Sequence, residues 1–157
     1  MKQKITVIGG SGFVGTNFCQ FLADQQISFE IVDLKVSTRF PDQTAIGDVR
    51  DVQSLRGAVT GDVVVNLAAV HRDDVTDKKE YFATNVEGAE NIAQICREKN
   101  IRKVIFTSSV AVYGFAAPET GEDGDINPFN EYGQTKYLAE EKFRAWQGEG
   151  GNSLIIV

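Results

Sequence analysis

Short apolar runs alternate with longer amphipathic stretches along the whole chain. The run Ile5–Ile8 stops at glycines, and apolar residues then recur at helical spacing, which predicts a strand, a tight turn and a helix. The segment from Phe115 to Asn130 holds prolines, glycines and acids, as is typical of an irregular surface loop. Further strands are predicted at residues 28–33, 44–46, 62–67, 103–107 and 153–157, and helices at residues 51–59, 77–99 and 131–146.

The predicted strands are apolar throughout and lack polar alternation. Such strands are typical of sheets whose two faces are both covered by helices. We therefore expect an α/β fold, a doubly wound parallel sheet of the Rossmann type with strand order 3-2-1-4-5-6 and helices on both faces. Ligands of such sheets bind beyond the carboxyl ends of the strands, where the strand order reverses beside the first strand.

A glycine-rich turn, GGSGFVG at residues 9–15, follows the first predicted strand. Residues without a Cβ let the chain turn sharply, approach a pyrophosphate and pack the next helix on the sheet. The N–H groups that open this helix then face the phosphates, together with the positive end of the helix dipole. Two registers fit, GxGxxG from Gly10 and GxxGxxG from Gly9, so the glycines alone do not choose a family. The candidate phosphate contacts are Gly9, Gly12, Phe13, Val14 and Gly15.

Carboxylates follow the second and third predicted strands. Asp33 can accept hydrogen bonds from the adenosine ribose hydroxyls and repel a 2′-phosphate, which favours NAD over NADP. A helix cap or a solvated turn is the alternative for Asp33, and the nearby Lys35 and Arg39 could hold a phosphate. Asp48 can accept from the adenine amino group while Val49 lies against the ring. Capping of the next helix is nearly as good an interpretation of Asp48.

Tyr132 and Lys136 stand one turn apart on a predicted helix, so their side chains share one face. A phenol titrates near ~10 in water and is a poor base at neutral pH. A neighbouring ammonium and a positive nicotinamide both favour the phenolate. Lys136 can also fix the nicotinamide ribose, and Ser109, after the fifth strand, can hydrogen-bond the reacting oxygen. These residues indicate a dinucleotide site with a catalytic tyrosine.

Taken together, these segments resemble the N-terminal part of an extended short-chain dehydrogenase/reductase, of the NAD-dependent epimerase/dehydratase family that acts on nucleotide sugars. The resemblance covers nearly the whole chain. It rests on GGSGFVG (9–15), Asp33, GDVRD (47–51), NLAA (66–69), NVEG (85–88), TSSVAVYG (107–114) and YGQTKYLAE (132–140).

The resemblance implies that Tyr132 is the acid/base, Lys136 the partner that lowers its pKa, and Ser109 the third member. Ser109 is chosen over Ser108 because the family's catalytic hydroxyl stands five residues before the glycine of the V-Y-G ending. The resemblance also implies that Asn85 supports the active-site helices, although a polar bridge inside a long helix is an alternative. Residues implied to bind the cofactor are Leu67, Ala68, Ala69 and Asn85.

The residues beside Ser109 bear on the subclass. Sugar 4,6-dehydratases of this family place an Asp-Glu pair directly after the catalytic hydroxyl, whereas this chain has Val110 and Ala111. The resemblance therefore implies a nucleotide-sugar 4-epimerase, with a reductase, dehydrogenase or dehydratase of the same family as alternatives. Another alternative is a dinucleotide-binding sensor without catalysis. Family members often dimerise through helices that correspond here to residues 77–99 and 131–146, so we expect a homodimer.

Length and charge limit the other possibilities. The chain of 157 residues suffices for one cofactor-binding domain, 1–157, but it stops within the sixth predicted strand, so we expect the substrate-binding half to be absent. With a net charge of -6 and no basic cluster, nucleic acid and anionic membranes are unlikely partners. The lack of a signal-peptide core and of an apolar run of ~20 residues predicts a cytoplasmic protein. Cys19 and Cys96 lack metal-ligand spacing, and His71 is interpreted as a bystander.

Overall fold

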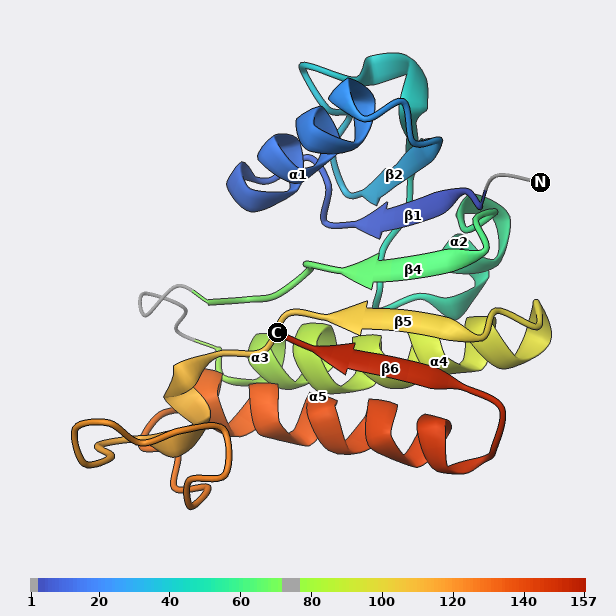
Figure 1. The fold of residues 1–157 in the computed structure, drawn as a ribbon. Coiled ribbons are helices and arrows are strands. Elements are labelled where there is room, and N and C mark those ends of the chain that lie inside the picture. Colours follow the sequence, from blue (N-terminus) through green and yellow to red (C-terminus); the bar gives the residue numbers. More distant parts are fainter. Residues whose placement is uncertain (1–2, 72–76) are drawn as a thin grey trace.

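The computed structural model of the protein describes residues 3–71 and 77–157, in which strands and helices alternate (Figure 1). The strands are β1 (Ile5–Ile8), β2 (Phe29–Asp33), β3 (Thr44–Ile46), β4 (Val63–Asn66), β5 (Lys103–Phe106) and β6 (Ser153–Ile156). The α-helices are α1 (Phe13–Asp24), α2 (Val52–Ala58), α3 (Lys79–Tyr81), α4 (Gly88–Glu98) and α5 (Glu131–Gly148). Short 3₁₀ helices are η1 (Pro41–Gln43) and η3 (Val110–Tyr113), and η2 (Phe82–Glu87) is a π-helix.

The described strands form one parallel sheet in the order β3-β2-β1-β4-β5-β6, which confirms the predicted doubly wound topology. Ile8 pairs with Val32 on one side and with Asn66 on the other, and Asn66 pairs with Phe106. Because these residues are in register, the strands β1, β2, β4 and β5 end at one edge of the sheet. The segments that leave the strands there are brought side by side.

Helices cover both faces of the sheet, and each face has its own apolar core. On one face, Cys19 and Leu22 of α1 pack with Val7 and Ile31. On the other face, residues of α2, α4 and α5 pack against β1, β2, β4 and β5, and in Figure 1 α4 and α5 lie behind β5 and β6. In the described part of the chain, no helix has the length and apolarity to cross a bilayer.

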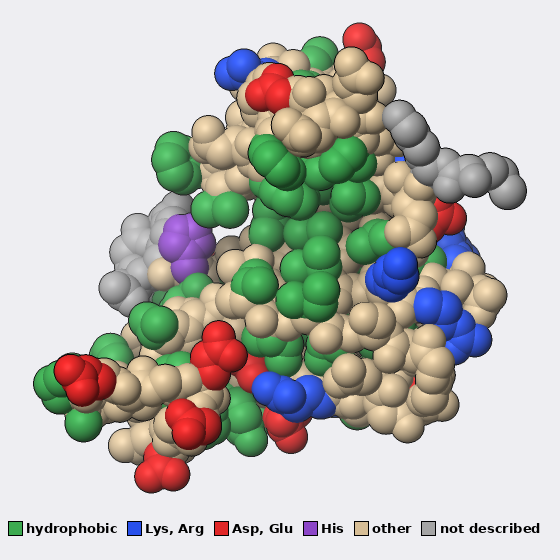
Figure 2. All heavy atoms as spheres, in the orientation of Figure 1, with side chains coloured by type: hydrophobic (Ala, Val, Ile, Leu, Met, Phe, Trp, Pro, Cys, Tyr) green, Lys and Arg blue, Asp and Glu red, His purple; other side chains and the backbone are tan. Residues whose placement is uncertain are grey.

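The face that carries α1 is only partly covered. Contacts of α1 are with β1 and β2. Figure 2 shows hydrophobic side chains gathered over the middle of the sheet on this face. Ile155 of β6 is 51% exposed, and Val157 is more exposed still. The helices therefore bury β1 and β2 on this face but leave apolar side chains of β6 open.

The helix predicted at residues 77–99 is not regular. It begins at Lys79, after Asp77 accepts a hydrogen bond from the Lys79 N–H at 3.0 Å, and it widens into the π-helix η2 before α4. The predicted helix is therefore present from Lys79 onward, but a wider π-helical segment interrupts it. Asn85, in the widened segment, is buried and hydrogen-bonded to Val70 and to Thr135. Such π segments recur at functional sites.

Candidate functional site

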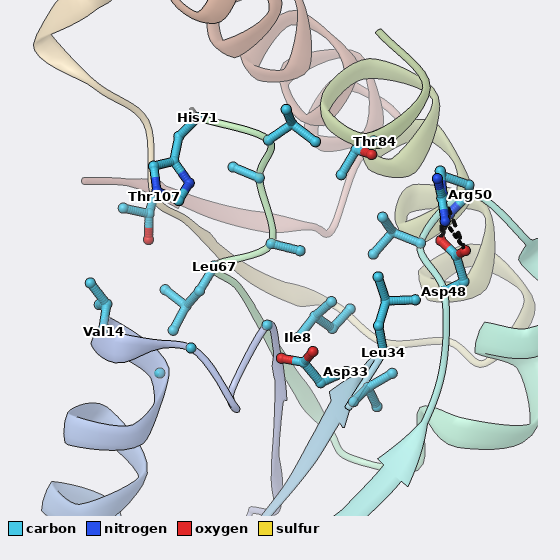
Figure 3. A pocket seen from close by; sticks show the side chains of 18 of the residues that line it. Ile8, Val14, Asp33, Leu34, Asp48, Arg50, Leu67, His71, Thr84 and Thr107 are labelled. Atoms are coloured by element: carbon cyan, nitrogen blue, oxygen red, sulfur yellow. Dashed lines mark hydrogen bonds and ion pairs between the residues drawn. The ribbon is translucent and has the colours of Figure 1, made fainter. Parts of the chain in front are cut away.

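A cleft of about 750 Å³ runs along the carboxyl ends of β1, β2, β4 and β5 and past the segment that follows β3 (Figure 3). It brings together most of the residues that the sequence singled out. Those on its lining are Gly9, Gly12, Phe13, Val14, Gly15, Asp33, Asp48, Val49, Leu67, Ala68, Ala69, Tyr132 and Lys136. Ser109 and Asn85 are not among the lining residues.

The glycine-rich turn is packed too tightly for side chains. Gly9 has a φ of +80°, and a Cβ there would lie 2.7 Å from the backbone nitrogen of Ala68. A Cβ on Gly15 would lie 2.5 Å from both the Cα of Gly10 and the carbonyl oxygen of Gly9. Glycine is therefore required where the turn meets the segment after β4 and where α1 folds back on the turn.

The first turn of α1 is open to an anion. Gly12, the N-cap residue, has no side chain that could cap the opening N–H groups of the helix. No acidic residue lies in the first turn. Phe13 and Val14 follow with exposed side chains on the rim of the cleft. The opening N–H groups and the positive end of the helix dipole are thus available to phosphate oxygens.

Asp33 ends β2 beside the glycine-rich turn, and Figure 3 shows its carboxylate in the cleft. Its Oδ2 accepts a hydrogen bond from the Ser11 N–H at 3.0 Å, and its Oδ1 accepts from the Lys35 N–H at 3.4 Å. These bonds orient the carboxylate without using a cation. The Nε of Arg39 donates to Gln20 on α1 at 2.6 Å. Arg39, the alternative phosphate ligand, is therefore engaged with α1.

Asp48 forms an ion pair with Arg50 at the far end of the cleft (Figure 3). The Arg50 Nη2 lies 2.7 Å from Oδ2, its Nε lies 3.0 Å from both oxygens, and the Arg50 N–H donates to Oδ1 at 2.9 Å. Hydrogen bonding to Arg50 lowers the pKa of Asp48. The capping alternative for Asp48 is not what the structure has, because Asp51 is the N-cap of α2 and accepts from the Gln53 N–H.

The other end of the cleft is formed by α5 and the segment after β5. Lys136 is only 3% exposed; its Nζ donates to the carbonyl oxygen of Thr107 and lies 4.1 Å from the centre of the Phe106 ring. Burial lowers the pKa of Lys136 to about 8, against the opposing effect of the Glu140 carboxylate. Tyr132, one turn earlier on α5, lines the same end of the cleft. A phenol and a buried amine with a shifted pKa are thus placed together in a pocket, a combination typical of proton-transfer sites.

The two serines after β5 take different places. Ser108 lines the cleft, and its hydroxyl donates to the Glu140 carboxylate. Ser109 is the N-cap of η3, and its hydroxyl oxygen accepts from the Ala111 N–H at 3.2 Å. The assignment of Ser109 as the third catalytic residue stays a prediction. The role of Ser108 in holding a buried carboxyl group was missed by the sequence, because it depends on a residue far along the chain.

Asn85 lies beside the cleft and joins two of its walls. Its Oδ1 accepts from the Val70 N–H at 2.8 Å, and its Nδ2 donates to the Val70 carbonyl oxygen at 3.0 Å and to Thr135 Oγ1 at 2.9 Å. Asn85 therefore ties the segment after β4 to α5. This is a buried bridge between elements, and direct contact of Asn85 with a cofactor stays a prediction.

Several lining residues were not predicted from the sequence. Some directly follow a residue that was: Leu34 follows Asp33, and Arg50 follows Val49. The sequence signal that could have identified them is their position at or just beyond the end of a predicted strand. His71 and Thr107 also have this position. Figure 3 places His71 near Thr107 at one end of the cleft. The remaining unpredicted lining residues are Ile8, Val32, Gly47, Val70, Glu80, Thr84 and Ser108.

Comparison with known proteins identifies the family of the chain. The family model of the NAD dependent epimerase/dehydratase family matches residues 5–157. The chain is 42% identical over 160 residues to an N-acetyl-alpha-D-glucosaminyl-diphospho-ditrans,octacis-undecaprenol 4-epimerase of Escherichia coli O157:H7, covering 100% of this chain and 48% of that protein. The chain spans about half the length of the curated relatives it matches.

Solved structures give the same picture. A short-chain dehydrogenase/reductase superfamily protein from Agrobacterium tumefaciens with bound NAD matches with a TM-score of 0.89 and 31% identity, over 98% of this chain and 48% of that one. A UDP-glucose 4-epimerase from Brucella ovis in complex with NAD matches with a TM-score of 0.86 and 28% identity, over 98% of this chain and 50% of that one. From its glycine-rich turn to the last strand, the chain belongs to the NAD dependent epimerase/dehydratase family.

Proposed function

We propose that this domain binds NAD and serves a 4-epimerase that acts on a nucleotide-linked hexose. The observation that carries the proposal is that Tyr132 and Lys136 line the same cleft as the glycine-rich turn and Asp33. One ligand that spans the cleft would meet the phosphate-binding turn, the ribose carboxylate and the proton-transfer pair. Relatives named UDP-glucose 4-epimerase support a nucleotide-linked hexose. The relative from Escherichia coli O157:H7 is named for a hexose joined through a diphosphate to undecaprenol, so the diphosphate-linked hexose is what the two kinds of substrate share.

The cleft fits the parts of NAD in sequence. The open first turn of α1 suits the pyrophosphate, and Asp33 suits the hydroxyls of the adenosine ribose. Asp48 and Val49 suit the adenine, and Lys136 suits the nicotinamide ribose. Because a carboxylate at Asp33 repels a 2′-phosphate, we propose NAD rather than NADP as the cofactor.

The chemistry follows from the catalytic end of the cleft. Bound NAD would supply the hydride acceptor, and in the reverse sense the hydride donor, for carbon 4 of the sugar. Tyr132 takes the proton of the 4-hydroxyl at its phenol oxygen and later gives it back. The ammonium of Lys136 favours the phenolate form of Tyr132, and Ser109 donates a hydrogen bond to the reacting oxygen.

The test uses this domain joined to the further half that its relatives possess, since we propose that the chain is the cofactor half of a longer enzyme. Conversion of UDP-glucose to UDP-galactose in the presence of NAD is followed by ¹H NMR, with UDP-N-acetylglucosamine as a second substrate. Tyr132→Phe is expected to lower turnover by about 10³-fold, because it removes the proton-transfer group. Its NAD affinity is expected to stay within about twofold of the parent protein.

Two results bear on the alternatives. Unchanged turnover in Tyr132→Phe would remove Tyr132 from the mechanism. Tight NAD binding without turnover of any diphosphate-linked hexose would favour the non-catalytic dinucleotide-binding module instead. The presence of Tyr132 beside Lys136 in the cleft argues against that module, since a pure binding protein has no need of a proton-transfer group there. A homodimer and a cytoplasmic location stay predictions.

A further inference from the structure

Glu140 is a buried carboxyl group for which the proposed reaction has no use. It lies on α5 one turn after Lys136 and is only 6% exposed. Its Oε1 accepts a hydrogen bond from the hydroxyl of Ser108, and its Oε2 lies 3.2 Å from the Nη2 of Arg144. Burying a carboxylate is costly unless partners compensate, so its place beside the catalytic end calls for an explanation.

Two successive turns of α5 hold two successive residues of the segment after β5. Lys136 donates to the carbonyl oxygen of Thr107, and Glu140 accepts from the hydroxyl of Ser108. The Ser108 N–H donates to the carbonyl oxygen of Val157 at 2.7 Å. The next residue is Ser109, so this pair of contacts sets where the predicted third catalytic residue stands relative to α5.

The same carboxylate acts on the buried amine of Lys136 through its charge. Burial lowers the pKa of Lys136, and the charge of Glu140 raises it, so the two effects oppose each other. The other charged or titratable groups that α5 contributes here are the guanidinium of Arg144, which is exposed and bonded to Glu140, and the phenol of Tyr132, which is neutral. The segment after β5 contributes a carbonyl and a hydroxyl. Among the described residues, Glu140 is the acid whose charge acts on Lys136.

We propose that Glu140 is a positioning residue, which anchors the segment carrying Ser109 through Ser108 and supplies the counter-charge that keeps Lys136 cationic. This inference rests on the proposed function in one respect, namely that the ammonium of Lys136 serves Tyr132. The anchoring and the electrostatic effect are both properties of the folded domain. They can be measured without substrate.

The test is a pH titration of the protein labelled with [ε-¹³C]lysine, in which the NMR signal lost in Lys136→Met identifies Lys136. Glu140→Gln keeps an oxygen for the hydroxyl of Ser108 and removes the charge. It is expected to lower the pKa of Lys136 and so weaken its proton binding about tenfold. Glu141→Gln is the matched control, because Glu141 is the exposed neighbour on the same helix and lies 3.9 Å from the same arginine. It is expected to leave the titration of Lys136 unchanged.

A second variant acts in the opposite direction and at the surface. Arg144→Gln removes the cation that partly neutralises Glu140, so it is expected to strengthen proton binding by Lys136 about twofold to threefold. If Glu140→Gln does not fold, this variant still decides, and an unchanged titration in Arg144→Gln would then overturn the proposal. A Glu140→Gln protein that folds but titrates like the parent would overturn it directly. Loss of turnover is not a criterion here, so a failure of the proposed epimerase leaves this result readable.

Discussion

Glu30 and Lys136 are two buried charged groups, one near the amino ends of the strands and one beyond their carboxyl ends. The surrounding residues stabilise the two charges very differently. Glu30, on β2, accepts hydrogen bonds from Lys4 Nζ and Thr6 Oγ1 at 2.6 Å each, and from the N–H groups of Thr60 and Gly61. Burial raises the pKa of Glu30, but these hydrogen bonds outweigh burial, so its pKa is lowered overall. Glu30 is thus fully provided with partners for its charged form.

Lys136 is provided with much less. Its ammonium has the Thr107 carbonyl oxygen and the face of the Phe106 ring, and the nearby Glu140 acts through space. Burial dominates, and the pKa of Lys136 falls to about 8. The charge of Glu30 therefore stabilises the fold, whereas the charge of Lys136 in the cleft lowers the stability of the fold. A buried charged group whose pKa is shifted in this way is typical of functional sites.

The largest change in stability is expected when Glu30, the charge with many hydrogen-bond partners, is removed. Glu30→Ala leaves the buried hydroxyl of Thr6 and the N–H of Thr60 without their acceptor, takes one of two acceptors from the buried Gly61 N–H, and is expected to lower the free energy of unfolding by about 3 kcal/mol. Urea denaturation measures this, with the exposed Glu141→Ala as the control that should change stability by less than ~0.5 kcal/mol. A cost for Glu30→Ala as small as that of the control would contradict the structural role given to Glu30.

Removing the other charge should act in the opposite direction. Lys136→Met deletes an amine that burial disfavours and keeps an apolar stem against Phe106, so it is expected to raise the free energy of unfolding by about 2 kcal/mol at pH 7. The same variant should lose turnover in the longer protein. Urea denaturation at pH 7 checks the first part, and a destabilised Lys136→Met domain would count against a strained lysine.

The pH dependence sharpens the comparison, because the two charges act in different pH ranges. Above its unfolded pKa near ~4.3, Glu30 stabilises the fold, and that contribution is lost as the pH falls through the lowered folded pKa. Lys136 destabilises the fold at neutral pH, and the penalty is relieved as the pH rises from about 8 toward the unfolded pKa near ~10.4. The stability advantage of Lys136→Met should therefore shrink over that alkaline range.

The matching measurement is urea denaturation of the parent and Lys136→Met at a series of pH values from neutral to alkaline. An advantage that stays constant across the alkaline range would mean that Lys136 does not titrate there. Glu30→Gln gives the acid counterpart, since its deficit relative to the parent should narrow as the pH falls below 4 or so.

A smaller effect is expected at the adenine end, where the charges are exposed. Arg50→Gln frees the Asp48 carboxylate from its ion pair, and we expect NAD to bind about threefold more weakly because the carboxylate is less well oriented. An analogue of NAD with hypoxanthine in place of adenine lacks the amino group and should bind both proteins equally well. Calorimetric titration with the two dinucleotides measures this, and an equal loss for both would place the effect of Arg50 elsewhere than on the amino group.

The sequence predicted features that depend on local patterns, and it did not predict contacts between residues far apart in the chain. Strands, their order, the glycine-rich turn and Asp33 depend on local patterns, and the structure has each of them. The sequence did not predict the π-helix η2. It also did not predict the hydrogen bonds of Glu30 or the bond between Ser108 and Glu140, which join residues far apart in the chain. Periodicity and spacing do not reveal which distant side chain will satisfy a buried group.

The most direct test of the whole account is a calorimetric titration of the 157-residue chain with NAD, with NADP as the comparison. We expect NAD to bind at least about tenfold more tightly than NADP, and Asp33→Asn to remove most of this difference, because the carboxylate selects the free ribose hydroxyls. Equal affinities for the two dinucleotides, or an Asp33→Asn variant that still prefers NAD, would contradict the assignment of this cleft.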